Sequence, residues 1–188
     1  MTPDLWKAWR QPSQDEVMAS CCHRAAIGAL APLLAAYHPI LCVGCGDGTE
    51  LAYFPGSVGV TLNAGGLLPA CRHRHGVVVA DMHCLPFRDG AFSAVFCKDT
   101  FEHALSPWIA LNELTRVARD CVLLATPDES WDHSPLHPLI PTVRQVNAMA
   151  QKLGWQVKTA SLTCTDPTTH CSWDLRVALL TRGTHAAC

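Results

Sequence analysis

The chain has few charged residues, and neither sign of charge dominates. Charged residues make up 16% of the 188 residues and hydrophobic residues 49%, with a formal net charge of −2 and a pI near 6.5. This composition excludes a disordered chain and predicts one well-filled domain, since domains commonly hold roughly 100–200 residues. Without an excess of basic residues no field attracts nucleic acid or an anionic membrane, so we expect neither as a partner.

Long hydrophobic runs are also missing. The longest nearly uncharged apolar stretch, residues 25–37, contains Pro32 and is shorter than the ~20 residues that a membrane-spanning helix needs. It lies too far from the first residue for a secretory signal, and no small-residue cleavage pattern follows it. We therefore expect a cytoplasmic protein without a membrane span.

Cysteine, by contrast, is abundant, with 11 residues in the chain. The count is odd and most cysteines lie in apolar runs, such as those of Cys42, Cys97 and Cys121, which is not typical of a secreted disulfide scaffold. The one C-x-x-C pair, Cys42 and Cys45, has no second pair at zinc spacing. We expect reduced thiols that act as small apolar core residues, and no metal.

Short apolar runs predict the strands. They lie at residues 40–43, 57–62, 77–80, 93–97, 121–125, 155–162 and 174–181. Helices are expected over residues 108–118 and 142–153, and a capping box at residues 13–16 opens a helix that runs towards Tyr37. The alternation predicts an α/β fold: a Rossmann-like, doubly wound sheet of about seven strands, mostly parallel. Because no helix separates the last two strands, we expect an antiparallel C-terminal hairpin.

A glycine-rich segment directly follows the first expected strand, where residues 44–50 read Gly-Cys-Gly-Asp-Gly-Thr-Glu. Ligands of open parallel sheets bind outside the carboxyl ends of the strands, and glycines there let a ligand approach the main chain. This favours a cofactor loop over an ordinary turn. A dinucleotide is disfavoured because Gly48 comes early and the second strand ends without an acid. A P-loop is excluded because no G-K-[ST] follows.

Four ordered motifs resemble those of one family, the class I S-adenosylmethionine (SAM)-dependent methyltransferases of the small type 11 kind. They lie at residues 40–48, 58–63, 80–93 and 101–117, and the similarity is dense over about residues 39–126. The resemblance implies a single methyltransferase domain over residues 1–188. Its parts would be an N-terminal arm and helix (1–38), a cofactor-binding core (39–126), and a substrate-side loop, helix and C-terminal hairpin (127–188).

The resemblance also implies where SAM would bind. The glycine loop would admit the methionine and ribose parts, and the end of the second strand would meet the ribose hydroxyls. Asp81 would accept a hydrogen bond from the adenine amino group, with Met82 against the ring. The expected cofactor-binding residues are Gly44, Cys45, Gly46, Asp47, Gly48, Thr61, Leu62, Asn63, Asp81, Met82 and Lys98.

The chain departs from the family at two positions where many relatives carry an acid, Cys42 and Thr61. In the family the first acid helps to hold the cofactor's ammonium and the second holds the ribose hydroxyls. Glu50 is a candidate for the missing charge near the loop, and Arg119-Asp120 replaces the usual Pro-Gly-Gly turn. These departures keep open a noncatalytic protein that binds the cofactor or a partner protein.

Methyl transfer from a sulfonium is an in-line displacement, in which the protein aligns the acceptor and excludes water. An oxygen or nitrogen acceptor that must lose a proton also benefits from a general base. The segment after the fourth strand offers His103 as this base, with Glu102 or Asp99 orienting it or taking its place. The alternative is that Glu102 and His103 only cap and orient the following helix.

The acceptor would lie under the loop of residues 127–141, which is rich in carboxylates and imidazoles and suits a polar or aromatic ligand. Three of its side chains offer a weaker alternative, a divalent metal site: Asp132, His133 and His137. We expect a small-molecule or glycan- or lipid-type acceptor rather than nucleic acid, whose methylating enzymes carry motifs that this chain lacks. The pocket is either open or completed by the N-terminal arm or another subunit, as in a homo-oligomer.

Overall fold

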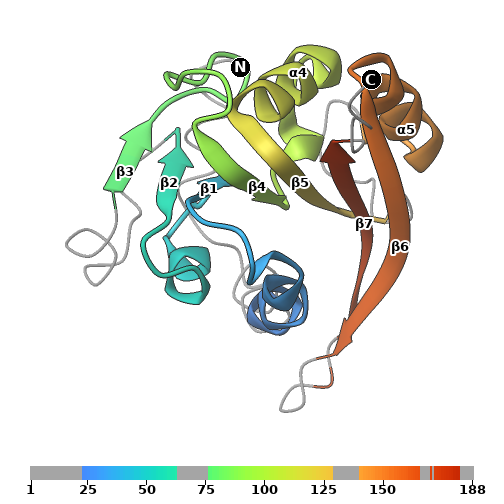
Figure 1. Ribbon diagram of the computed structural model, residues 1–188. Coiled ribbons are helices and arrows are strands. Elements are labelled where there is room, and N and C mark those ends of the chain that lie inside the picture. Colours follow the sequence, from blue (N-terminus) through green and yellow to red (C-terminus); the bar gives the residue numbers. More distant parts are fainter. Residues whose placement is uncertain (1–22, 63–75, 129–139, 166–169, 171, 183–188) are drawn as a thin grey trace.

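The computed structural model describes residues 23–62, 76–128, 140–165, 170 and 172–182 (Figure 1). The strands of the described chain are β1 (Ile40–Val43), β2 (Val58–Thr61), β3 (Gly76–Val79), β4 (Phe92–Lys98), β5 (Ala118–Pro127), β6 (Trp155–Thr165) and β7 (Ser172–Arg182). The helical elements are a helix over residues 23–30, then η1 (Ala31–Leu34), η2 (Thr49–Tyr53), η4 (Phe101–His103), α4 (Pro107–Val117) and α5 (Val143–Lys152).

The seven strands form one sheet in the order β3-β2-β1-β4-β5-β7-β6. The first five strands pair in parallel, and β7 runs antiparallel to both β5 and β6. The predicted fold class is therefore confirmed, including the antiparallel hairpin. Because chain order reverses between β1 and β4, the carboxyl ends of these two strands border the place where such sheets bind ligands.

Alternate side chains of the central strands point to the two faces of the sheet. Val122 and Leu124 of β5 belong to a core that α4 and α5 cover, whereas Cys121 and Leu123 belong to a second core. This second core is covered by residues 23–34 and η2, which lie across the sheet from α4 and α5 in Figure 1. Strands buried on both faces explain why the central runs are apolar throughout.

The helices differ from expectation in two places. The helix expected to run towards Tyr37 is α-helical only to residue 30 and then tightens into η1, because Pro32 has no backbone N–H to donate. The capping box at residues 13–16 lies outside the described residues. A capping box does open α5, where Thr142 Oγ1 accepts from Gln145 N at 3.2 Å and Gln145 Oε1 accepts from Thr142 N at 2.8 Å.

The described cysteines bear out the expectation of core thiols. The free, buried ones are Cys42, Cys45, Cys97, Cys121 and Cys164, and Cys84 is free and exposed. Burial raises the pKa of the Cys42 and Cys97 thiols well above the ordinary value, which keeps them protonated. Within the described part of the chain, no helix has the length and apolar character needed to cross a membrane.

Candidate functional site

The glycine loop turns sharply at the end of β1. Gly44, Gly46 and Gly48 have φ values of 81°, 49° and 88°, a region that side chains rarely adopt. The backbone N–H groups of Gly44 and Cys45 both donate to Val60 O, at 2.8 and 2.9 Å, so the loop is fastened to the end of β2. A Cβ on Gly44 would lie 2.6 Å from Thr100 Cβ, whereas one on Gly46 would meet nothing closer than 3.9 Å. The loop is therefore tight against Thr100, which follows β4, and has open space at Gly46.

The structure brings only some of the expected cofactor residues to the open edge. Asp47 is exposed and its Oδ1 accepts from Thr49 N at 2.8 Å, which starts η2. Leu62 is 39% exposed, whereas Cys45 and Thr61 are buried. Asn63 lies outside the described residues. Of the two described residues expected to meet the ribose hydroxyls, Thr61 is therefore buried and Leu62 is the exposed one.

A charged cluster lies beside the loop, made of the buried Glu50 and Lys98 and the half-buried His23 and Asp99. The Lys98 ammonium contacts Asp99 Oδ2 and lies 2.8 Å from His23 Nδ1. Because an ammonium only donates, Nδ1 accepts and the His23 proton is on Nε2, which faces Glu50 Oε1 at 3.8 Å. Lys98 and Glu50 are each 1% exposed. The sequence suggested Glu50 but gave no signal for His23, which comes from 75 residues before Lys98.

The two carboxyl groups of this cluster differ in protonation. Burial raises the pKa of Glu50 well above its ordinary range, and the nearby Lys98 ammonium only partly offsets this. Burial also acts on Asp99, but the Lys98 ammonium beside it lowers its pKa below the ordinary value. Both Glu50 oxygens and Asp99 Oδ1 are buried without a hydrogen-bond partner among the described residues. These unpaired acceptors fit a bound cation such as the ammonium of SAM.

Asp99 also marks the sharp exit from β4. Its φ of 46° is unusual for a residue other than glycine. The chain then enters η4, where Glu102 is 1% exposed with Oε2 unpaired and His103 is half-buried. Burial, followed by repulsion from Asp99, raises the pKa of Glu102 well above its ordinary value. The predicted catalytic residues thus share one short segment next to the charged cluster.

Asp81 follows β3 and is 56% exposed at its side chain. Its Oδ1 accepts hydrogen bonds from His83 N at 2.9 Å and from His83 Nδ1 at 2.6 Å. Partial burial by itself raises the pKa of Asp81, but these hydrogen bonds lower it below the ordinary value. Met82 is 7% exposed and packs in the core under α4. Sequence reasoning missed His83, although an Asp followed two residues later by a polar side chain is a common turn signal.

The motif residues Glu113 and Arg116 of α4 hold the loop that follows Asp81. Arg116 donates from Nε to Glu113 Oε1 at 2.7 Å, and from Nη1 and Nη2 to Phe87 O and Leu85 O at 2.7 and 3.0 Å. Glu113 Oε2 in turn accepts from Leu85 N at 2.8 Å. These two motif residues therefore stabilise the loop next to the site.

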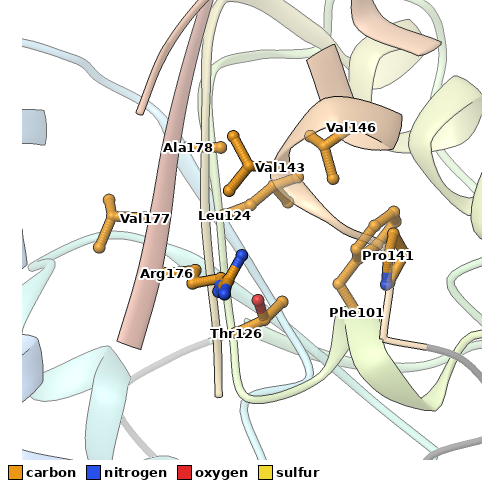
Figure 2. A pocket seen from close by; sticks show the side chains of 9 residues that line it. All are labelled: Phe101, Leu124, Thr126, Pro141, Val143, Val146, Arg176, Val177 and Ala178. Carbon is orange, nitrogen blue, oxygen red and sulfur yellow. The ribbon is translucent and has the colours of Figure 1, made fainter. Parts of the chain in front are cut away.

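A pocket lies between Phe101 of η4, β5, β7 and the first turns of α5 (Figure 2). The pocket is a small hollow of about 20 Å³ that opens to solvent, and its lining residues are Phe101, Leu124, Thr126, Pro141, Val143, Val146, Arg176, Val177 and Ala178. The one charged lining residue, Arg176, lies opposite Thr126 and donates from Nε to Asp128 Oδ2 at 2.9 Å. Most of the wall is apolar.

The pocket adjoins the two ends of the expected acceptor loop. Residues 127–128 and 140–141 are described, and Asp132, His133 and His137 lie outside the described residues. Among the residues that the structure does describe, no group of three or more His, Cys, Asp or Glu side chains could hold a metal.

The chain is similar to known methyltransferases in part of its sequence and in its fold. Residues 41–125 match a family model described as a methyltransferase domain. A search of curated proteins finds no match. Similar solved structures include YcgJ from Bacillus subtilis, with a TM-score of 0.68 and 17% identity, covering 86% of this chain and 99% of that one.

Two further structures are similar over almost the whole chain. Magnesium protoporphyrin IX methyltransferase (ChlM) from Synechocystis PCC 6803 with bound SAM has a TM-score of 0.70 and 12% identity, covering 95% of this chain and 91% of that one. A chain from the complex of the Haloferax volcanii Trm112 methyltransferase activator with a methyltransferase has a TM-score of 0.70 and 16% identity, covering 100% of both chains. At these identities the likeness is one of fold.

Proposed function

Residues 41–125 match a methyltransferase-domain model, and from this match and the fold we propose that the protein is a class I methyltransferase that methylates an acceptor with SAM. The acceptor atom is an oxygen or nitrogen of a small-molecule or glycan- or lipid-type compound. The observation that carries the proposal is the convergence, at the carboxyl ends of β1 and β4, of the glycine loop with buried carboxyl oxygens of Glu50 and Asp99 that accept no hydrogen bond from the described residues.

The residues of this edge fit the parts of SAM, which when bound supplies a methyl group on a sulfonium. At Gly46 the loop has open space, so the main chain there can be approached by the methionine and ribose parts. Glu50 and Asp99 offer acceptors for the ammonium, and Glu50 supplies the carboxyl group that Cys42 lacks. Asp81 offers its exposed carboxylate to the adenine amino group.

On the acceptor side we assign the proton transfer to His103. His103 is half-buried in η4, two residues after Phe101 of the pocket lining and four residues after Asp99 of the charged cluster, a place that suits a base. Glu102 and Asp99 act as orienting groups, because Glu102 is buried and Asp99 is held by Lys98. The apolar side chains that line the hollow beside η4 suit contact with a hydrophobic or aromatic part of the acceptor, and we place the reaction in the cytoplasm.

A second candidate is a noncatalytic protein that binds the cofactor or a partner. The observation that favours it is the pair of neutral, buried side chains, Cys42 and Thr61, at positions where many relatives carry acids. The likeness to a chain that was solved with a methyltransferase activator supports a protein partner for such a fold. Binding of SAM without turnover of any acceptor is the behaviour expected of this candidate.

Calorimetric titration of SAM and S-adenosylhomocysteine (SAH) into the reduced protein tests the proposal. We expect micromolar binding that Asp81→Ala weakens by about tenfold or more, because one hydrogen bond to a charged acceptor is lost. Asp120→Ala is the matched control: it removes a carboxylate at the opposite, amino-terminal region of β5, where Asp120 pairs with Arg119. Absence of binding by both ligands up to millimolar concentration would refute the cofactor site and with it the enzyme.

A further inference from the structure

The imidazole of His83 connects two parts of the site through both of its nitrogens. Nδ1 lies 2.6 Å from Asp81 Oδ1, and Nε2 lies 3.2 Å from the backbone nitrogen of Ser106. The backbone N–H of His83 donates to the same Asp81 oxygen at 2.9 Å. The His83 side chain is 20% exposed, against 56% for Asp81. The ring is therefore packed between the two groups, and the carboxylate is the accessible member.

These contacts determine where the ring carries its proton. The Ser106 N–H can only donate, so Nε2 of His83 must accept, and the proton of the neutral ring is on Nδ1. From there it is donated to Asp81 Oδ1. Among the described residues no hydrogen bond reaches Asp81 Oδ2, which leaves this oxygen as the acceptor for a ligand.

Ser106 makes the connection a rigid one. It is the N-cap residue of α4, and its own side chain makes no capping hydrogen bond. The backbone N–H of Cys84 donates to Asp81 O at 3.0 Å, so Asp81 and His83 lie in one closed turn. With the ring bonded to α4 on one side and to the carboxylate on the other, rotation of the Asp81 side chain breaks a charge-assisted hydrogen bond.

We propose that His83 is a positioning residue that fixes the Asp81 carboxylate for the amino group of the cofactor's adenine, and thereby sets the preference for a 6-aminopurine over a 6-oxopurine. This inference rests on the proposed function, in which Asp81 accepts a hydrogen bond from that amino group. A 6-oxopurine has a carbonyl oxygen where adenine has its amino group. This oxygen accepts hydrogen bonds, as the Asp81 carboxylate does, so the two repel each other when the carboxylate is fixed. A carboxylate free to rotate discriminates less.

Two substitutions separate the two hydrogen bonds of the ring. The amide nitrogen of asparagine stands near the place of imidazole Nδ1, so His83→Asn keeps a donor for Asp81 but does not reach Ser106. The amide of glutamine stands near the place of Nε2, so His83→Gln keeps an acceptor for Ser106 but loses the donor to Asp81. Each variant loses one hydrogen bond, so a purely structural role predicts similar effects of both.

The experiment measures the Kd of SAH and of its deaminated analogue, S-inosylhomocysteine, for the wild type, His83→Asn and His83→Gln. We expect the wild type to prefer SAH by about 10- to 100-fold. His83→Asn should keep this preference, and His83→Gln should reduce it several-fold. Equal preferences in the wild type and His83→Gln would overturn the positioning role, as would equal losses in both variants.

Asp81→Ala distinguishes the failure of this inference from the failure of the proposed function. It should bind SAH and the inosine analogue equally and more weakly than the wild type binds SAH. If Asp81→Ala keeps the full preference, the adenine contact itself is wrong. If the wild type does not bind SAH, the proposed function and the role of His83 are refuted together.

Discussion

At the scale of single residues, Glu50 couples the stability of the fold to pH. Its carboxyl group is buried without a hydrogen-bond partner among the described residues, and burial raises its pKa well above the ordinary value. The folded chain therefore keeps a proton that the unfolded chain releases at about pH 4.3, the pKa of an unperturbed Glu. The resulting contribution to stability is complete below that pH and is lost as pH rises towards the pKa of the folded state.

We expect Glu50→Gln to remove this dependence, because the amide has the shape of the protonated carboxyl group and does not ionise. Urea unfolding at several pH values between about 5 and 8 should show the variant gaining stability relative to the wild type as pH rises. Asp120→Asn, which changes a carboxylate that is 44% exposed, should run parallel to the wild type. Parallel curves for Glu50→Gln and the wild type would contradict the buried, protonated state.

The glycine loop allows a second comparison between two residues. Gly44→Ala should cost about 3 kcal/mol of unfolding free energy, because a left-handed φ is combined with overlap on the Thr100 side chain. Gly46→Ala should cost only about 1 kcal/mol, since its Cβ meets open space. Chemical unfolding of both variants checks this order. In addition, Gly46→Ala should weaken SAM binding, because the methyl group occupies the space through which the cofactor approaches.

At the scale of elements, Arg116 ties α4 to the loop after Asp81. Its planar guanidinium reaches Glu113, Asp89 and two backbone carbonyls at once, a geometry that an ammonium cannot reproduce. We expect Arg116→Lys to lower the unfolding free energy by about 2 kcal/mol, through the loss of two or more hydrogen bonds. Arg144→Lys, on the exposed surface of α5, should change it by less than about 0.5 kcal/mol. Equal effects of the two changes would show that the guanidinium hydrogen bonds of Arg116 do not stabilise the loop.

Most elements could be predicted from the sequence because burial acts on consecutive residues. The strands appear where expected, and β6 and β7 are longer, since the hairpin continues beyond the apolar runs through exposed polar residues such as Thr163, Thr165 and Ser172. The helix towards Tyr37 ends early because a single proline outweighs its helical pattern. The short η2 between β1 and β2 has no repeating apolar face that could have announced it.

At the scale of the whole molecule, the site could be predicted only as far as its residues follow one another in the chain. The glycine loop, Asp81 and the segment from Asp99 to His103 each directly follow a strand, so the topology alone gathers them at one edge. His23 comes close to Lys98 only because the helix over residues 23–30 packs on the second core. Contacts that depend on packing between distant segments leave no spacing in the sequence to detect.

Three buried cysteines in the central strands allow a prediction of how the sheet unfolds. Cys42 lies in β1, Cys97 in β4 and Cys121 in β5, three neighbouring strands, and each thiol is fully buried. Burial raises the pKa of Cys121 to about 12 and the pKa of the other two thiols well above the ordinary value, so none reacts in the folded state. If the sheet opens as one unit, these thiols become reactive together, at the rate of global unfolding.

Pulse labelling of the reduced protein with N-ethylmaleimide, read by peptide mass spectrometry, measures this directly. The exposed thiol of Cys84 should be labelled in the folded state and serves as the internal control. Cys42, Cys97 and Cys121 should be labelled with one common rate, which SAM slows if it binds the folded state alone. Faster labelling of Cys42 than of Cys121 would mean that the edge carrying the glycine loop opens before the sheet does. In that case the cofactor site would belong to a less stable unit than the strands that support it.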